Sequence, residues 1–220
     1  FYYAGGVPAV MEEIKSMLHL DVMTVTGKTL GENLEELKAG GFYDKCDGYL
    51  KKWGLKRTDV IRTFEEPIGT DGTVAILRGN LAPEGSVVKH SAVPKEMFKA
   101  VLKAKPFDCE EDAIEAVISR KIQPGDAVFI RYEGPKGSGM PEMFYTTEAI
   151  SSDPELGKTI ALITDGRFSG ASKGPAIGHV SPEAADGGPI ALVEEDDLIR
   201  IDIPERVLEI IGVKGEELPK

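Results

Sequence analysis

The sequence contains few of the residues that cross-link a chain or anchor it in a membrane. Two of its 220 residues are cysteines, Cys46 and Cys109, and neither lies in a CxxC or Cys/His spacing. Two such cysteines favour free thiols in a reducing, cytoplasmic compartment, although the count alone permits a disulfide. No apolar run approaches the roughly 20 residues that span a bilayer, so the sequence predicts no transmembrane helix.

Positive charge is also scarce. The 26 lysines and arginines are outnumbered by 37 aspartates and glutamates, which gives a formal net charge of -11. A surface this acidic repels phosphate backbones and anionic lipid headgroups. We therefore expect no nucleic-acid or membrane partner, although a substrate could be anionic if a metal supplies local positive charge.

The first part of the sequence has helical patterns. Residues 5–20 place apolar side chains on one helical face, and residues 29–39 begin at a Thr-Leu-Gly-Glu sequence and end before Gly40 and Gly41. Residues 42–66 are mixed in composition and are expected to be irregular. Because the sequence starts at Phe1 inside FYYAGGVPAVMEEI, we expect residues 1–66 to be a helical and irregular lead-in from a preceding domain.

From about residue 72 the sequence changes to short β-branched runs separated by Gly, Pro and Asp. Helical patterns interrupt them at residues 95–104 and 109–120. Many short strands with few helices favour a mixed α and β domain over residues 67–220, built as a closed or nearly closed β-barrel of the swivelling-domain type with flanking helices. The predicted strands are 73–77, 86–89, 127–131, 160–164, 176–180, 189–193 and 198–203.

Three loops rich in glycine and polar residues follow predicted strands, at residues 78–85, 131–143 and 164–174. Glycines let backbone N–H groups approach a ligand, so rigid strands that carry such loops suit a binding site. Ser169 lies in the third loop between Phe168 and Gly170. Its hydroxyl could project outward beside N–H groups that bind an anion, or it could cap the turn that follows.

Individual side chains in these loops leave alternatives open. Glu142 follows Pro141, which stiffens the backbone, so its carboxylate suits a hard cation such as Mg²⁺, but it could be an ordinary surface glutamate. Asp165 and Arg167 could form a local ion pair. His179 lies in an apolar run, where a hydrogen-bonded structural histidine is commoner than a ligand.

Several motifs resemble one enzyme family. Residues 163–170 (ITDGRFSG), 178–184 (GHVSPEA) and 130–143 with RYEGPKG and GMPEM are similar to the C-terminal domain of the dihydroxy-acid and phosphogluconate dehydratases. Residues 75–85 (AILRGNLAPEG) and 4–11 (AGGVPAVM) also resemble that family, in the same order along the chain. The matches cover nearly the whole sequence.

The resemblance implies a hydro-lyase that uses Mg²⁺ and an iron–sulfur cluster to convert a 2,3-dihydroxy acid into a 2-keto acid. It implies that Ser169 is the base that removes the C2 proton, that Glu142 is a Mg²⁺ ligand, and that Gly170, Ala171 and Ser172 contact the substrate. The family's cluster cysteines, further Mg²⁺-binding acids and modified lysine precede the matched region. Cys46 and Cys109 match no cluster motif.

These implications lead to expectations for the whole enzyme. The chain should fold but lack activity without its own N-terminal domain, and the full-length enzyme should be a homodimer. The small residue at position 171, Ala171, favours a resemblance to the family members that act in branched-chain amino-acid (valine and isoleucine) biosynthesis. The alternatives are a sugar-acid dehydratase domain, a non-catalytic partner-binding module of the same fold, and an aconitase-like swivelling domain.

Overall fold

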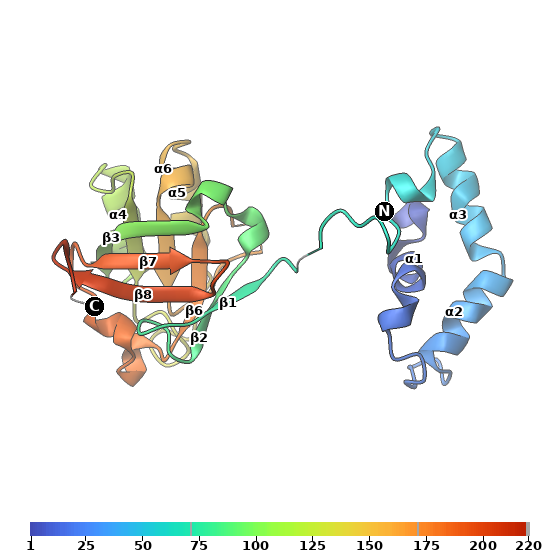
Figure 1. Ribbon diagram of the computed structural model, residues 1–220, viewed down its shortest axis with the longest axis horizontal. Helices are drawn as coiled ribbons and strands as arrows, with labels where there is room; N and C mark the ends of the chain where they lie inside the picture. The colour runs from blue at the N-terminus through green and yellow to red at the C-terminus, as the bar shows by residue number, and fades with distance from the viewer. Residues whose placement is uncertain (71, 171, 219–220) are drawn as a thin grey trace. The chain divides into compact units, whose positions relative to one another are not determined.

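The computed structural model describes residues 1–70, 72–170 and 172–218. Contacts between residues divide the chain into two units, Phe1–Asp71 and Gly72–Lys220, which are drawn in Figure 1. Each unit contains its own cluster of buried apolar side chains.

The first unit is helical. It contains α1 (Gly6–Glu13), α2 (Leu30–Ala39) and α3 (Phe42–Lys51), with 3-10 turns at Tyr2–Ala4, Lys15–Met17 and Arg57–Asp59. At the start of α2, the Thr29 side chain accepts a hydrogen bond from the Glu32 N–H, and the Glu32 carboxylate accepts one from the Thr29 N–H. This capping box satisfies two backbone donors, which explains why α2 begins where the sequence predicts.

The expectation that residues 42–66 are irregular was wrong for α3. Tyr43, Cys46 and Leu50 are buried and lie at helical spacing, so they form one apolar face on α3. Charged residues and Gly48 between them hid this pattern in the sequence. Tyr43 and Leu50 contribute to the core of the unit together with Ala4, Ala9 and Ile61.

The second unit is built on one mixed sheet, in which the described residues form nine strands in the order β1-β2-β6-β5-β4-β3-β7-β8-β9. Neighbours β3, β4, β5 and β6 are parallel, and the other neighbours are antiparallel. The strands are β1 (Ala75–Leu77), β2 (Gly85–Val88), β3 (Lys99–Phe107), β4 (Asp126–Ile130), β5 (Ala161–Thr164), β6 (Ala176–Ser181), β7 (Leu198–Asp202), β8 (Val207–Val213) and β9 (Glu216–Glu217).

The central strands are buried on both faces. In β4, Ala127 and Phe129 point into the core enclosed by the curled sheet, whereas Val128 and Ile130 point to a second apolar cluster on the outer face. Helices α4 (Glu110–Ile118), α5 (Phe144–Ser151) and α6 (Leu156–Thr159) contribute to this second cluster and cover β4 and β5. Continuous apolar runs such as AVFI and ALIT are typical of parallel strands that are covered on both sides.

The sheet is a curled half-barrel, so the expected closed or nearly closed barrel was wrong (Figure 1). Its order ends at β1 and β9, and an isolated bridge between Arg78 and Val207 links the chain after β1 to β8. Gly79 permits this approach, since a Cβ there would lie 2.2 Å from the Leu208 carbonyl oxygen. The Arg78 backbone N–H donates to the Arg206 carbonyl and its carbonyl accepts from the Leu208 N–H, but β1 and β8 are not paired as strands among the described residues.

Two elements were assigned the wrong secondary structure. The helix expected at residues 95–104 is a 3-10 turn followed by β3, where exposed Val101 and Lys103 alternate with buried Leu102 and Ala104. Leu, Ala and Lys are strong helix formers, so their propensity concealed a strand alternation that tertiary pairing selects. The strand expected at residues 189–193 is a 3-10 turn, Pro189–Leu192, that begins at a proline without an N–H donor.

Candidate functional site

The two loops that carry Glu142 and Ser169 meet side by side. They follow β4 and β5, which are parallel neighbours and therefore release their loops at the same edge of the sheet. Glu142 forms an isolated parallel bridge with Arg167, and the Met143 N–H donates to the Arg167 carbonyl at 2.9 Å. The expected metal ligand is thus paired through its backbone with the residue two positions before Ser169.

Side-chain direction at this bridge follows the alternation of extended chains. Met143 and Phe168 contact the apolar cluster beneath α4 and α5, with Met143 fully buried. Glu142 and Arg167 are exposed. The Glu142 carboxylate therefore points away from the core, where it could reach a ligand or a covering domain.

Buried Asp165 ties the loops together. Its side-chain oxygens accept hydrogen bonds from the N–H groups of Tyr132 (3.1 Å), Glu133 (3.0 Å) and Ala184 (2.8 Å). The residue is 1% exposed. The expected local ion pair between Asp165 and Arg167 was wrong, since none is formed among the residues described. Asp165 instead fixes the 131–143 loop and the start of the 184–186 turn against β5.

A second carboxylate packs beneath the same loop. Glu183 is 7% exposed and accepts a hydrogen bond from the Lys136 N–H at 2.8 Å. A Cβ at Gly134 would lie 1.8 Å from Glu183 Oε2, so the close approach of this loop requires glycine. Glu133 is also buried, and its carboxylate accepts a hydrogen bond from the Ser138 hydroxyl. Contacts with the buried carboxylates of Glu183 and Glu133 therefore fix the loop that presents Glu142.

Ser169 lines a cavity of about 230 Å³. The turn that bears it crosses the outer face of β6 and β2, where Val87, Ala176 and Gly178 leave room, and the Ser172 N–H donates to the Ser169 carbonyl at 3.0 Å. Ser169 is partly exposed, so its hydroxyl is not sealed in the core. The other lining residues are Thr73, Val74, Lys89, Phe168, Gly170, Ser172, Gly174 and His179.

The cavity brings together three of the four expected residues of the turn. Ser169, Gly170 and Ser172 all line it, whereas Ala171 lies outside the described residues. The Ser172 hydroxyl is buried and has no hydrogen-bond partner among the described residues. An unsatisfied buried hydroxyl costs about 1–3 kcal/mol, so a ligand that bonds to it would recover that cost. Glu142 is not among the residues described as lining the cavity.

Two lining residues add polar chemistry that the sequence did not indicate as part of the site. The Lys89 ammonium donates to the Gly170 carbonyl at 2.7 Å, which puts a positive charge beside the Ser169 turn. His179 is exposed and has a backbone φ of 55°. Its backbone N–H donates to the Gly166 carbonyl at 2.8 Å. Lys89 directly follows the apolar run of β2 in the sequence. Its proximity to Gly170 arises only from the tertiary fold.

The described residues supply part of a metal site and no cluster site. No group of three or more His, Cys, Asp or Glu side chains that could hold a metal occurs among residues 1–70, 72–170 and 172–218. The exposed Glu142 carboxylate fits one position of a Mg²⁺ shell, which takes oxygen ligands. The sequence contains two cysteines, and both are free thiols, fewer than an iron–sulfur cluster requires.

Strands that end in glycine-rich polar loops around a small cavity suit the binding of a small molecule, and comparisons with known proteins identify the family of this domain. Residues 59–220 match the dihydroxy-acid/6-phosphogluconate dehydratase C-terminal model, and residues 1–33 match the N-terminal model of the same family. The chain belongs to the dihydroxy-acid/6-phosphogluconate dehydratase family, as its motifs indicated.

Curated relatives support the same family. The chain is 52% identical to a dihydroxy-acid dehydratase of Methanosarcina barkeri over 219 residues, which cover 99% of this chain and 37% of that protein. It is 53% identical to a dihydroxy-acid dehydratase of Solidesulfovibrio magneticus over 211 residues, which cover 94% of this chain and 35% of that protein. The chain thus spans little more than a third of the length of these relatives.

A helix that spans a membrane requires a certain length and hydrophobicity. Within the part of the chain that the structure describes, every helix is too short or too polar to cross a bilayer.

Proposed function

We propose that this chain is the C-terminal half-site of a dehydratase that converts a 2,3-dihydroxy acid into a 2-keto acid. The observation that carries the proposal is the shared cavity of Ser169, Gly170 and Ser172, on a turn whose backbone is paired with the Glu142 segment. Family membership and relatives named dihydroxy-acid dehydratase support the same reaction class.

The reaction needs a base at C2 and assistance for the hydroxide that leaves C3. We assign the base to the Ser169 side-chain oxygen, which takes the C2 proton and leaves an enol that tautomerises to the 2-keto acid. A serine oxygen is a weak base unless positive charge stabilises its ionised form. The Lys89 ammonium, bonded to the Gly170 carbonyl, supplies such charge beside the turn.

The proposed cofactors are Mg²⁺ and an iron–sulfur cluster. Mg²⁺, when bound, supplies Lewis acidity for the leaving hydroxyl and further stabilises an ionised serine. Glu142 contributes one oxygen ligand from its exposed position. The remaining ligands and the cluster cysteines are assigned to the N-terminal domain of the full-length enzyme, which we propose to be a cytoplasmic homodimer.

The cavity favours a branched-chain substrate over a sugar acid. Val74, Val87 and Phe168 supply an apolar part of the cavity wall. A short aliphatic side chain would be buried favourably against that wall, whereas the hydroxyls of an aldonic acid would lose hydrogen bonds to water. We therefore propose the dihydroxy-acid dehydratase reaction of valine and isoleucine biosynthesis rather than a sugar-acid dehydration.

The experiment is steady-state turnover by the full-length parent with Ser169→Ala, assayed on 2,3-dihydroxyisovalerate and on aldonic acids. Loss of a general base should lower kcat by roughly 10²–10⁴-fold. Ser151→Ala is the matched control, because its hydroxyl bonds locally to the Glu148 carbonyl within α5. That control should keep the parent's kcat.

A second measurement separates proton removal from folding or binding defects. The parent should exchange the C2 hydrogen of a bound substrate with solvent deuterium, and the Ser169→Ala variant should lose this exchange while it still binds. Wild-type turnover by Ser169→Ala on its best substrate would show that the assigned base is wrong. Faster turnover of an aldonic acid than of 2,3-dihydroxyisovalerate by the parent would refute the substrate assignment.

A further inference from the structure

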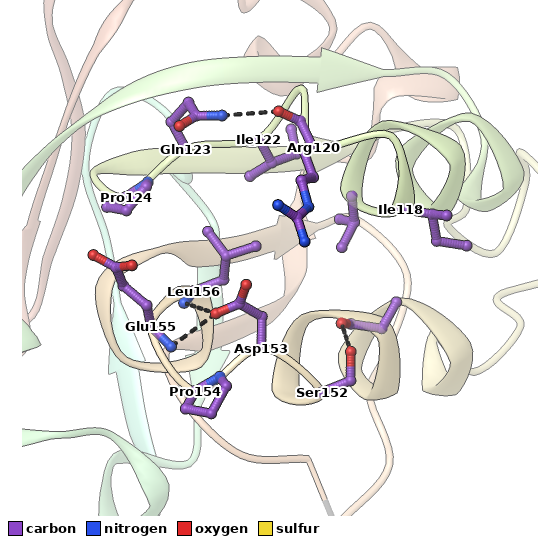
Figure 2. Close-up of a pocket in the computed structure, with 12 residues that line it drawn as sticks. Ile118, Arg120, Ile122, Gln123, Pro124, Ser152, Asp153, Pro154, Glu155 and Leu156 are labelled. Atoms are coloured by element: carbon purple, nitrogen blue, oxygen red, sulfur yellow. Dashed lines mark hydrogen bonds between the residues drawn. The ribbon is translucent and has the colours of Figure 1, made fainter.

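A separate hollow of about 700 Å³ lies at the edge of the sheet where β4 and β5 begin (Figure 2). It is formed by the end of α4, the turn into β4, the end of α5 and the turn into α6. The Ser169 loop leaves β5 at the other end of that strand, so the dehydratase proposal does not use this hollow. The lining residues are Val117, Ile118, Arg120, Ile122, Gln123, Pro124, Ala149, Ser152, Asp153, Pro154, Glu155 and Leu156.

Arg120 directs its guanidinium into this hollow in Figure 2. No carboxylate among the described residues lies within ion-pair distance of it. Arg120 has φ 57, in the left-handed region that residues with a Cβ rarely adopt. Its N–H donates to the Val117 carbonyl, and the Gln123 side chain donates to the Arg120 carbonyl at 2.8 Å. The end of α4 thus holds a cation that has no ion-pair partner among the described residues, in a conformation that glycine would adopt more easily.

Asp153 faces this cation across the hollow. One of its oxygens, Oδ1, accepts from the N–H groups of Glu155 (2.9 Å) and Leu156 (3.2 Å) at the start of α6. Figure 2 shows its second oxygen on the side towards Arg120. No donor among the described residues bonds to that oxygen. The hollow therefore offers a guanidinium and a carboxylate oxygen that are not bonded to each other.

The rest of the lining combines aliphatic side chains with the polar side chains of Gln123, Ser152 and Glu155. Val117, Ile118, Ile122 and Leu156 line the hollow, and Ile118 is 71% exposed. An apolar ligand group that covered Ile118 would remove apolar surface from water, which is favourable by about 25 cal/mol per Å². A ligand of this site should therefore combine an anionic group, a cationic group and a small apolar group.

We propose that this hollow binds an α-amino acid with a short aliphatic side chain. Its carboxylate would receive hydrogen bonds from the forked guanidinium of Arg120, which suits planar carboxylates. Its ammonium would donate to the second oxygen of Asp153, and its side chain would cover Ile118 and Ile122. The opposite charges of the two protein groups match the zwitterion.

The hollow is linked to the Glu142 segment by α5. This helix begins at Phe144, two residues after Glu142, and ends at Ser151 beside the lining residues Ser152 and Asp153. Its eight residues correspond to a length of about 12 Å at 1.5 Å per residue. A ligand in the hollow would thus contact the helix that starts next to the proposed metal ligand.

The ligand side of the proposal is tested by isothermal titration calorimetry of the 220-residue chain with L-leucine. We expect a dissociation constant of about 1 mM or tighter, a modest affinity for an open site. The analogues 4-methylpentanoate, which lacks the ammonium, and 3-methylbutylamine, which lacks the carboxylate, should each bind at least about tenfold more weakly because each leaves one protein charge unpaired. Absence of L-leucine binding, or equal binding of either analogue, would overturn the proposal.

The protein side is tested with Arg120→Gln and Asp153→Asn. Each removes one charge, and asparagine keeps an oxygen that can accept the α6 N–H groups. Both should weaken L-leucine binding at least about tenfold, as expected for loss of a charged hydrogen bond. Lys121→Gln removes a neighbouring exposed charge that does not line the hollow and should bind as the parent does. Unchanged binding by both pocket variants, or equal weakening by Lys121→Gln, would place the ligand elsewhere.

Discussion

Among single residues, Asp165 shows how one buried carboxylate can position a loop that it does not belong to. Its two oxygens serve three backbone donors from segments far apart in the sequence. Those segments include the loop that presents Glu142. The residue therefore positions the proposed metal ligand from inside the domain, and it has no direct contact with the cavity that contains Ser169 among the residues described.

We expect Asp165→Ala to destabilise the domain strongly and Asp165→Asn to be milder. Alanine leaves the N–H groups of Tyr132, Glu133 and Ala184 without their acceptor, at a cost of about 3 kcal/mol or more. Asparagine keeps one acceptor oxygen, so Asp165→Asn should lower the free energy of unfolding by roughly half as much as Asp165→Ala does. Urea unfolding followed by far-UV circular dichroism measures both changes. Equal stability of the Asp165→Ala variant and the unsubstituted 220-residue chain would show that these hydrogen bonds do not hold the loops.

The residues of the candidate site were predictable to different degrees. Ser169, Gly170 and Ser172 were predicted from their motif, and the structure places all three at one cavity. The roles assigned to Ser169 and Glu142 remain proposals. Lys89 could not be found from sequence, because its proximity to residue 170 depends on pairing of β2 with β6. The same holds for Asp165, whose partners are set by tertiary structure.

Among the elements, those with complete local signals were predicted well. The helix α2 has a capping box and a following glycine pair, and α4 begins with three acidic residues that complement the helix dipole. Strands β4 and β5 are continuous apolar runs. In contrast, the first six residues of β3 are mostly good helix formers, and its identity as a strand comes from pairing with β4 and β7. Local propensity could not supply that information.

The alternation of β3 makes a prediction at two adjacent positions. Leu102 is 5% exposed and belongs to the inner core, whereas Val101 is 56% exposed. Leu102→Ala should therefore cost about 2–5 kcal/mol of unfolding free energy. Val101→Ala should cost less than about 1 kcal/mol, since it removes little buried surface. The same urea titration distinguishes the two, and similar costs at both positions would contradict the strand assignment.

For the whole molecule, the account predicts that folding and activity are separable. The unit Gly72–Lys220 has a curled sheet with apolar clusters on both faces, so its core is complete without further segments. The chemistry proposed above is not complete in this chain, because the described residues contain no full metal site and the sequence has too few cysteines for the proposed cluster. Folding and turnover should therefore be separable in one preparation.

We expect the purified 220-residue chain to unfold cooperatively yet to show no turnover of 2,3-dihydroxyisovalerate with Mg²⁺. Circular dichroism with temperature measures the first property, and a coupled assay of 2-keto acid measures the second. The full-length parent, assayed in the same buffer, is the positive control. Product formation by the 220-residue chain above the rate of buffer would mean that the catalytic groups are all present in this chain.

The central claim is that Glu142 and Ser169 face one divalent ion from adjacent loops. The most direct measurement is a crystal structure of the full-length parent with Mn²⁺ in place of Mg²⁺, with the ion located by anomalous scattering. We predict an ion bonded to a Glu142 oxygen at about 2.1 Å, with the Ser169 hydroxyl directed towards the same ion. An ion held by other residues, with the Glu142 carboxylate in solvent or the Ser169 hydroxyl turned away, would contradict the account.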